Sequence, residues 1–201
     1  MRFIRRSILA LLLVAAATPS HAQVRHRAIP RRQQPTVVIL VRHAEKDRSN
    51  PTASNPDLTA EGQRRARDLA RYIRGRRVRA IITTQLKRAR QTAAPAAEAF
   101  HVTPEIYTAT GDGERTGREM AELVRRHMGQ AVLVVGHSNT IPATIEALGG
   151  PKVAEICDSA FSNLFILVIR PGSAPTYNHT HYGEADPPGG RACVNGLVRA
   201  R

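Results

Sequence analysis

The sequence is poor in aromatic residues, with no tryptophan, four tyrosines and four phenylalanines among 201 residues. Proteins that bind single-stranded nucleic acids stack the bases on aromatic side chains, so this scarcity argues against nucleic acid as a partner. Lysine is scarce as well, because three of the 30 cationic side chains are lysines and 27 are arginines. Acidic residues number 16, and the resulting formal charge of +14 predicts an anionic partner.

The chain also lacks a long apolar run. Its longest, residues 8–17, is only half of the roughly 20 residues that a membrane-spanning helix needs. Three arginines precede this run, and the small-x-small pattern Ser20-His21-Ala22 follows it. These features predict a signal peptide over residues 1–22, with an uncleaved anchor as the alternative. We therefore expect a periplasmic or secreted protein with no stable membrane insertion after cleavage, whether export is general or twin-arginine.

Cysteine is nearly absent, with Cys157 and Cys193 the only two. An oxidising compartment would allow them to form a disulfide, and two unpaired thiols are the alternative. No cysteine-centred motif surrounds either residue, so neither is expected to be a nucleophile.

The rest of the chain divides simply. Residues 23–35 are basic, contain prolines and show no apolar period, which is typical of a flexible lead-in. Residues 36–201 have the length of one domain and contain no internal repeat. The oligomeric state is left open by the sequence.

Strand and helix patterns alternate through this domain. Continuous β-branched and apolar runs predict buried strands, and apolar residues at i, i+3, i+4 and i+7 predict helices between them. Strands are expected at residues 36–41, 78–83, 105–107, 131–135 and 163–170, with residues 174–182 pairing beside the last. The order predicts a three-layer α/β/α sandwich with a mainly parallel central sheet.

Capping residues predict where the helices begin and end. Thr59, followed by Glu61, is expected to cap the first helix, and Gly75 is expected to close it. Thr140 is expected to cap the helix that carries Pro142 in its first turn, where proline is tolerated.

Four basic side chains follow the strands in a way that predicts a common site. Arg42 and His43 follow the first strand, His137 follows the strand 131–135, and Arg88 lies near the start of a helix. Ligands of parallel sheets bind outside the carboxyl ends of the strands, so these side chains are expected to converge. Two guanidiniums and two imidazoles beside helix N-termini suit a tetrahedral oxyanion such as phosphate.

At these positions the chain resembles a known family. Val-Arg-His-Ala-Glu-Lys at residues 41–46, Leu-Lys-Arg-Ala-Arg-Gln-Thr at 86–92 and Val-Val-Gly-His-Ser at 134–138 are similar to three motifs of the histidine phosphatase superfamily, branch 1, the phosphoglycerate mutase-like proteins. The resemblance covers about residues 36–170 and implies the phosphoglycerate mutase-like fold.

The chain departs from the family pattern in two places. Ala44 stands where the family usually has glycine, and Ser138-Asn139 replaces glycines after the second histidine. These departures bear on the substrate subclass more than on the chemistry.

The resemblance implies a role for each matched residue. His43 would attack phosphorus and become a transient phosphohistidine, while Arg42, Arg88 and His137 would bind the phosphoryl oxygens. This chemistry requires no metal or other cofactor. A general acid that protonates the leaving group would lie in the loop after the second motif. The candidates there are Asp112, in a Gly-Asp-Gly loop, and Glu114, and the third alternative is that neither reaches the site.

We therefore expect an exported phosphomonoester phosphatase acting on a phosphorylated small molecule or an envelope phosphate. The alternatives are a phosphohistidine or envelope-sugar phosphatase, and a non-catalytic phosphate- or polyanion-binding module on the same fold. Residues 47–57 and 156–161 are expected to form the walls that select the substrate. Glu45 and Lys46 flank the pocket and could orient Arg42, contact the substrate or form an ordinary surface ion pair.

Two further features have a simpler interpretation. His179 and His181 share one strand face, but two ligands without a third are weak support for a metal site, and none is expected. Arginines crowd one stretch of the chain, where we expect them to cover the solvent face of a helix. They are Arg64, Arg65, Arg67, Arg71, Arg74, Arg76, Arg77 and Arg79.

Overall fold

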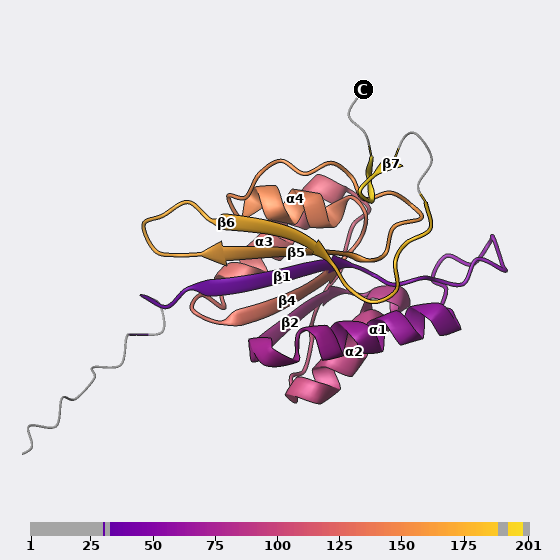
Figure 1. Ribbon diagram of the computed structural model, residues 1–201, viewed down its shortest axis with the longest axis horizontal. Coiled ribbons are helices and arrows are strands. Elements are labelled where there is room, and N and C mark those ends of the chain that lie inside the picture. Colours follow the sequence, from indigo (N-terminus) through magenta and orange to yellow (C-terminus); the bar gives the residue numbers. More distant parts are fainter. Residues whose placement is uncertain (1–29, 31–32, 189–192, 199–201) are drawn as a thin grey trace, which may run out of the picture.

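The computed structural model describes residue 30, residues 33–188 and residues 193–198 (Figure 1). The predicted signal peptide and all but a few residues of the predicted lead-in lie outside these described residues.

A six-stranded sheet with the order β3-β2-β4-β1-β5-β6 forms the centre of the molecule (Figure 1). The strands are β1 (Thr36–Arg42), β2 (Val78–Thr84), β3 (Glu105–Tyr107), β4 (Ala131–Gly136), β5 (Asn163–Ile169) and β6 (Thr176–His181). A separate two-stranded hairpin, β7 (Cys193–Val194) and β8 (Leu197–Val198), follows them in the chain.

The sheet has a parallel part and an antiparallel part. Strands β1, β4, β2 and β3 run parallel to one another, whereas β5 and β6 pair antiparallel beside β1. In the parallel register Leu40 lies beside Val134 and Arg42 beside Gly136. The carboxyl ends of β1, β4 and β2 therefore meet at one edge of the sheet, where the sequence predicts the site.

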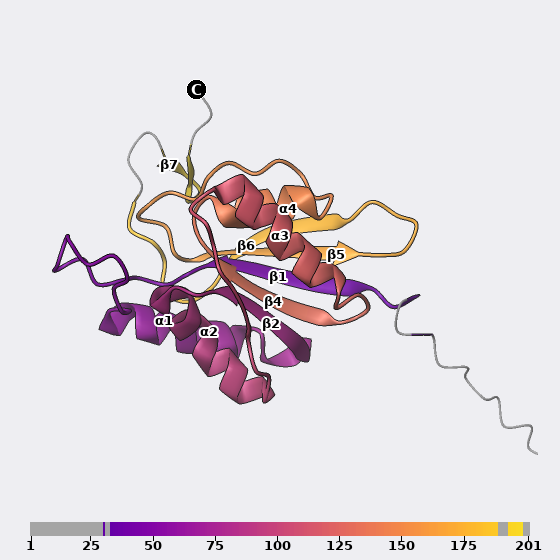
Figure 2. The ribbon, with the colours of Figure 1, turned by 180° about the vertical axis from the view of Figure 1, so that it is seen from behind.

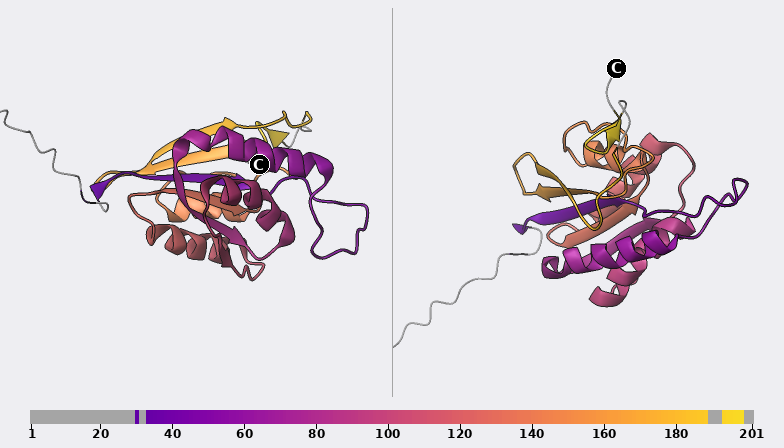
Figure 3. Two further views of the ribbon diagram at one scale, coloured as in Figure 1. Left: turned by 90° about the horizontal axis from the view of Figure 1, so that it is seen from below. Right: turned by 45° about the vertical axis from the view of Figure 1, so that its right-hand side comes forward.

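Two pairs of helices cover the two faces of the sheet (Figures 2 and 3). Helices α1 (Ala60–Tyr72) and α2 (Lys87–Phe100) pack together on one face, and α3 (Gly113–Arg125) and α4 (Thr140–Ala147) pack together on the other. The predicted three-layer α/β/α sandwich with a mainly parallel sheet is confirmed.

The alternation of side chains along β1 produces two cores. Val38 and Leu40 are fully buried against the α3 and α4 layer, while Ile39 and Val41 are buried against α1 and α2. Burying both faces requires an apolar residue at every position, which explains the continuous β-branched run. Each fully buried side chain of this kind contributes roughly 1.5–3 kcal/mol to the free energy of folding.

The predicted helix boundaries are partly correct. Thr59 caps α1, since its side chain accepts a hydrogen bond from the Gly62 amide. Gly75 does not close that helix: α1 ends at Tyr72, and the chain reverses at Arg77, whose φ is +50°. Thr140 is not the N-cap of α4 either, because Asn139 occupies that position. Instead the Thr140 hydroxyl accepts a hydrogen bond from the His137 amide.

A disulfide joins Cys157, in the loop before β5, to Cys193 at the start of β7, with 6.1 Å between their Cα atoms. None of the helices formed by the described residues has the length and apolar character of a membrane-spanning segment.

Candidate active site

A cavity of about 390 Å³ opens at the carboxyl edge of the parallel strands. Arg42 and His43 reach it from the end of β1, Arg88 from the first turn of α2, and His137 from the end of β4. The structure thus brings together the four side chains that the sequence assigned to one pocket. The rest of the lining comes from residues 138–140 and from Lys46, Gln85, Leu86, Ala109, Gly111, Asp112, Thr116, Glu155 and Asp158.

His43 is held as a neutral imidazole with one free nitrogen. Its Nδ1 lies 2.8 Å from the Ala44 carbonyl oxygen, an arrangement in which Nδ1–H donates and Nε2 keeps the lone pair. The His43 amide donates to the Gly136 carbonyl at 2.9 Å, which fixes the residue against β4. Burial lowers the pKa of His43 to about 2, and the charge of Arg42 acts in the same direction. Near neutral pH the ring is therefore uncharged and nucleophilic.

Arg42 is fixed before any ligand binds. Its Nη1 donates to the carbonyl oxygens of Cys157 and Ala160, at 2.6 and 3.2 Å, and its Nη2 lies 3.2 Å from a carboxylate oxygen of Asp158. The guanidinium also lies 4.5 Å from the ring centroid of Phe161, in cation–π geometry. Residues 157–161 thus form a cradle that sets the direction of this cation.

Arg88 is the opposite case. Among the described residues its guanidinium has no hydrogen-bond or ion-pair partner, and its Nε is buried and unsatisfied. Burial lowers the pKa of Arg88, yet an arginine remains charged at neutral pH. A half-buried cation without a counter-ion beside a cavity is an arrangement that an anionic ligand would complete.

His137 lies beside His43, with 5.3 Å between the two ring centroids and an edge-on geometry. Its Nε2 lies 2.9 Å from the Thr84 hydroxyl, which anchors the ring to the end of β2. Burial lowers the pKa of His137 to about 4, with the charges of Arg88 and Arg42 acting in the same direction. This imidazole is therefore also neutral near pH 7.

The two candidates for the general acid are separated by the structure. Asp112 lines the cavity, and its carboxylate caps α3 by accepting a hydrogen bond from the Arg115 amide at 3.0 Å. Glu114 does not line the cavity: its exposed carboxylate pairs with Arg118, at 3.7 Å, over a hollow between α3 and α4. Of the two candidates, the structure therefore places only Asp112 at the cavity that His43 lines.

Of the two segments predicted to form the walls of the pocket, one lies at the cavity and the other does not. Residues 156–161 do carry the groups that contact Arg42. Residues 47–57 contribute no residue to the lining of the cavity. Lys46, which directly precedes them in the chain, does line it. Thr84, which contacts His137, was missed by sequence reasoning because it belongs to no motif, and Asp158 was predicted only as part of the wall segment and not as a partner of Arg42.

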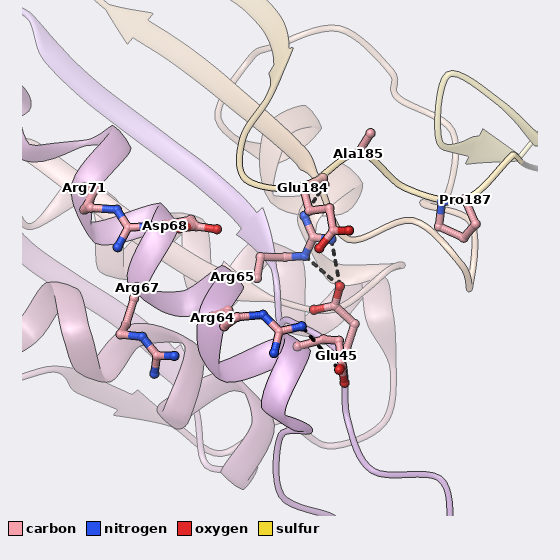
Figure 4. Close-up of a pocket in the computed structure, with 10 residues that line it drawn as sticks. Glu45, Arg64, Arg65, Arg67, Asp68, Arg71, Glu184, Ala185 and Pro187 are labelled. Carbon is pink, nitrogen blue, oxygen red and sulfur yellow. Dashed lines mark hydrogen bonds and ion pairs between the residues drawn. The ribbon is translucent and has the colours of Figure 1, made fainter.

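Glu45 neither orients Arg42 nor lines the cavity. It pairs with Arg65, whose Nη2 lies 2.7 Å from its carboxylate (Figure 4). Arg65 also donates to the carbonyl oxygens of Tyr182 and Glu184 and lies 3.8 Å from Asp186. The prediction that Arg65 covers the solvent face of α1 is wrong, because the side chain is buried as the centre of an ion-pair cluster behind the site.

His179 and His181 do not form a metal site with the residues described. His179 stacks on Phe165, and its Nε2 lies 2.7 Å from the Asn163 side-chain oxygen. Within the described ranges, no group of three or more histidine, cysteine or acidic side chains is arranged to hold a metal ion.

The sequence of residues 38–110 matches the family model described as histidine phosphatase superfamily (branch 1). This match confirms the resemblance for the two motifs that contain His43 and Arg88; the motif of His137 lies beyond the matched segment. No curated protein sequence matches the chain.

Solved structures share the fold at low identity. The protein histidine phosphatase SixA complexed with tungstate is 17% identical, with a TM-score of 0.56 over 72% of this chain and 96% of that one. A putative phosphohistidine phosphatase SixA from Agrobacterium tumefaciens is 23% identical, with a TM-score of 0.54 over 74% and 98%. A mycobacterial glucosyl-3-phosphoglycerate phosphatase is 16% identical, with a TM-score of 0.56 over 74% and 99%.

Proposed function

Because residues 38–110 belong to the histidine phosphatase superfamily, branch 1, we propose that the chain is a phosphomonoester phosphatase that works through a phosphohistidine on His43. The observation that carries the proposal is the state of His43. Its Nδ1 is bound to the Ala44 carbonyl, its charge is suppressed, and Arg42, Arg88 and His137 surround the same cavity. A neutral nucleophile among cationic donors suits attack on a phosphate dianion.

In the first step Nε2 of His43 gives its lone pair to phosphorus while the bond to the leaving oxygen breaks. Arg42 and Arg88 balance the negative charge on the equatorial oxygens, and His137 donates a hydrogen bond to them. In the second step water attacks the phosphohistidine, the P–N bond breaks, inorganic phosphate leaves and the neutral imidazole returns.

The leaving alkoxide needs a proton, and Asp112 is the carboxyl group placed to give it. Asp112 lines the cavity, is exposed, and already accepts a hydrogen bond from the Arg115 amide. One oxygen of this carboxylate is already engaged in capping α3. Leaving groups that need little protonation are therefore the better substrates for this arrangement, and phosphohistidine is the second candidate substrate on that ground.

The reaction as proposed needs no metal, since Arg42 and Arg88 supply the positive charge that a metal ion would otherwise bring. We further propose that residues 1–22 are a cleaved signal peptide and that the mature protein is periplasmic or secreted, which the disulfide supports. Mass spectrometry of the protein from the periplasmic fraction checks the cleavage site.

Hydrolysis of p-nitrophenyl phosphate in the presence of a chelator tests the activity. We expect turnover that His43→Ala abolishes, and an acid-labile phosphoenzyme that the same variant cannot form. Absence of turnover together with tight binding of inorganic phosphate would instead identify a non-catalytic binding module. Loss of turnover on chelation would remove metal independence.

The general acid is tested by comparing two leaving groups. Asp112→Asn should lower kcat for an alkyl phosphate by about 10²–10⁴, the range expected for a general acid, and should change aryl phosphate and phosphohistidine hydrolysis much less. Glu114→Gln is the matched control and should leave both rates unchanged. Equal rates for the alkyl substrate in wild-type and Asp112→Asn protein would remove Asp112 from the mechanism.

A further inference from the structure

The hairpin formed by β7 and β8 packs on the loop that precedes β5. The Cys157 amide donates to the Gly196 carbonyl at 2.9 Å, and the Val198 amide donates to the Glu155 carbonyl at 2.7 Å. A bridge between Ile156 and Leu197 lies between these two hydrogen bonds. In Figure 1 the hairpin lies at the end of the molecule next to α4. Residues 155–157 therefore have one side occupied by the C-terminal hairpin.

The opposite side of the same three residues faces the candidate active site. The Cys157 carbonyl accepts the 2.6 Å hydrogen bond from Arg42, the shortest contact of that guanidinium. The Ile156 amide donates to the Ser138 carbonyl at 3.1 Å, and Ser138 follows His137 in the chain. Residues 155–157 thus lie between the hairpin and two of the groups that would bind the phosphoryl oxygens.

The hairpin is too small to hold this position through its own hydrogen bonds. Each strand has two residues, and an isolated two-stranded hairpin is at best marginally stable in water. The turn is closely seated, since a Cβ at Gly196 would come within 2.4 Å of the Asn163 side chain. The disulfide between Cys157 and Cys193 is the covalent link that keeps the two parts together.

We propose that the Cys157–Cys193 disulfide is a positioning element of the active site, acting through Arg42. It holds the C-terminal hairpin against residues 155–157 and so fixes the carbonyl oxygen that directs the Arg42 guanidinium. This inference rests on the proposed phosphatase function. Without the disulfide the hairpin leaves, the Cys157 carbonyl shifts, and Arg42 no longer meets the developing negative charge in the right direction.

The test compares wild-type protein with the double variant Cys157→Ser/Cys193→Ser. We expect kcat for p-nitrophenyl phosphate to fall by about 10²-fold, the cost typical of a misplacement of roughly 1 Å. Circular dichroism at the assay temperature should be unchanged. A kcat equal to that of wild type, with only a lower Tm, would overturn the proposal, because the disulfide would then act on stability alone.

A double-mutant cycle shows whether the effect passes through Arg42. In an Arg42→Lys background, removing the disulfide should change kcat by less than about threefold, because the geometry it protects is already lost. In the matched Arg88→Lys background the full loss of about 10²-fold should persist, since the Arg88 guanidinium has no hydrogen bond or ion pair with the described residues 155–161. Multiplicative losses in both backgrounds would contradict the assignment.

Two further measurements keep the test decisive. If the double variant does not fold, a phosphine reductant is added to folded wild-type protein, and activity, free thiols and circular dichroism are followed together. Activity should fall with the appearance of thiols and before any loss of structure; a fall that accompanies unfolding would overturn the proposal.

If the oxidised wild type shows no turnover, the proposed function fails, and the Kd for inorganic phosphate is measured instead. A Kd that rises on disulfide loss only when Arg42 is present supports the positioning role, and an unchanged Kd refutes it.

Discussion

Two groups of arginines in this chain carry the same charge but differ in their burial, their contacts and their distance from the cavity. Arg42 and Arg88 lie at the cavity, one held by four residues and the other without a partner among the described residues. Residues 64–79 contain eight arginines, and all of them except Arg65 are exposed. The large group supplies eight of the 30 cationic side chains behind the charge that first suggested an anionic partner, but the small group is the one placed to bind a phosphate.

The larger group itself contains arginines with different surroundings. Arg64 and Arg65 are neighbours in α1, yet Arg64 is exposed and pairs with Glu61, while Arg65 is buried between Glu45 and Asp186. The carboxylate of Asp186 in turn accepts hydrogen bonds from the amides of Phe161 and Ser162. Position relative to the sheet, and not the local sequence, therefore decides what an arginine contributes.

The largest effect is expected for Arg65→Gln. Removing one partner of a buried ion pair leaves Glu45 uncompensated, which typically costs about 3–5 kcal/mol. We expect the free energy of unfolding, measured with urea, to fall by that amount. Arg64→Gln is the matched control and should change it by less than about 0.5 kcal/mol, because exposed ion pairs contribute little. A loss below about 1 kcal/mol for Arg65→Gln would show that the cluster is solvated.

The next largest effects are expected for substitutions of the two cavity arginines, which should differ in their effect on the free energy of unfolding. Arg88→Gln should lower kcat by about 10²–10³, the cost of one preorganised donor, while the free energy of unfolding stays unchanged because Arg88 has no partner to lose. Arg42→Gln should cost a similar factor in kcat and also destabilise the protein, since the Ala160 carbonyl loses the Arg42 donor and the Cys157 carbonyl keeps only the Ala160 amide. Arg90→Gln, exposed on the same helix as Arg88, is the control. Equal stability losses for Arg42→Gln and Arg88→Gln would refute the distinction.

The neutral imidazoles make stability depend on pH. In the folded protein the pKa of His43 is about 2 and that of His137 about 4, whereas an unfolded histidine titrates near 6.5. As pH falls below 6.5, these two histidines take up protons in the unfolded chain but stay neutral in the folded protein. Their contribution to stability is therefore present above that pH and is lost below it. Between pH 7 and pH 5 each residue should lower the free energy of unfolding by about 2 kcal/mol.

Urea titrations at pH 7, 6 and 5 measure this dependence. His137→Gln should remove about half of the loss, and His101→Gln, an exposed residue, should remove none. An identical pH dependence in wild type and His137→Gln would show that His137 is protonated in the folded state.

The convergence of the main site residues could be predicted from local sequence signals. Residues 36–41 read as a strand buried on both faces, and the rule that ligands bind beyond the carboxyl ends of parallel strands placed Arg42, His43 and His137 together. Arg42 is the last residue of β1, and His43 and His137 lie directly after β1 and β4. Their position therefore depends on strand boundaries and sheet order, both of which leave a clear pattern in the sequence.

The contacts that support the site leave no such pattern. Arg42 bonds to Cys157, 115 residues away, and Arg65 bonds to Glu184, 119 residues away. Both depend on how loops fold over the sheet, which no periodicity records. Likewise, Asp112 and Glu114 are equivalent as sequence, but two helical steps differ by about 200° in direction. Only the observed start of α3 shows that Asp112 lines the cavity and Glu114 does not.

The smallest effects on stability and activity are expected when exposed arginines are replaced. These substitutions test whether the larger group of arginines is indeed not involved in the site. Arg74, Arg76 and Arg79 are exposed, and none of them has an ion pair with another described residue. Replacing all three by glutamine should change the free energy of unfolding by less than about 0.5 kcal/mol per substitution. Because exposed charges act at a distance only through steering, kcat/KM for a phosphate ester should fall by less than about threefold at low salt. This difference should vanish at about 0.15 M salt, where the Debye length is about 8 Å. A larger loss of kcat/KM that persists at high salt would mean that this face of the molecule contacts the substrate, and that the division between placed and surplus arginines is wrong.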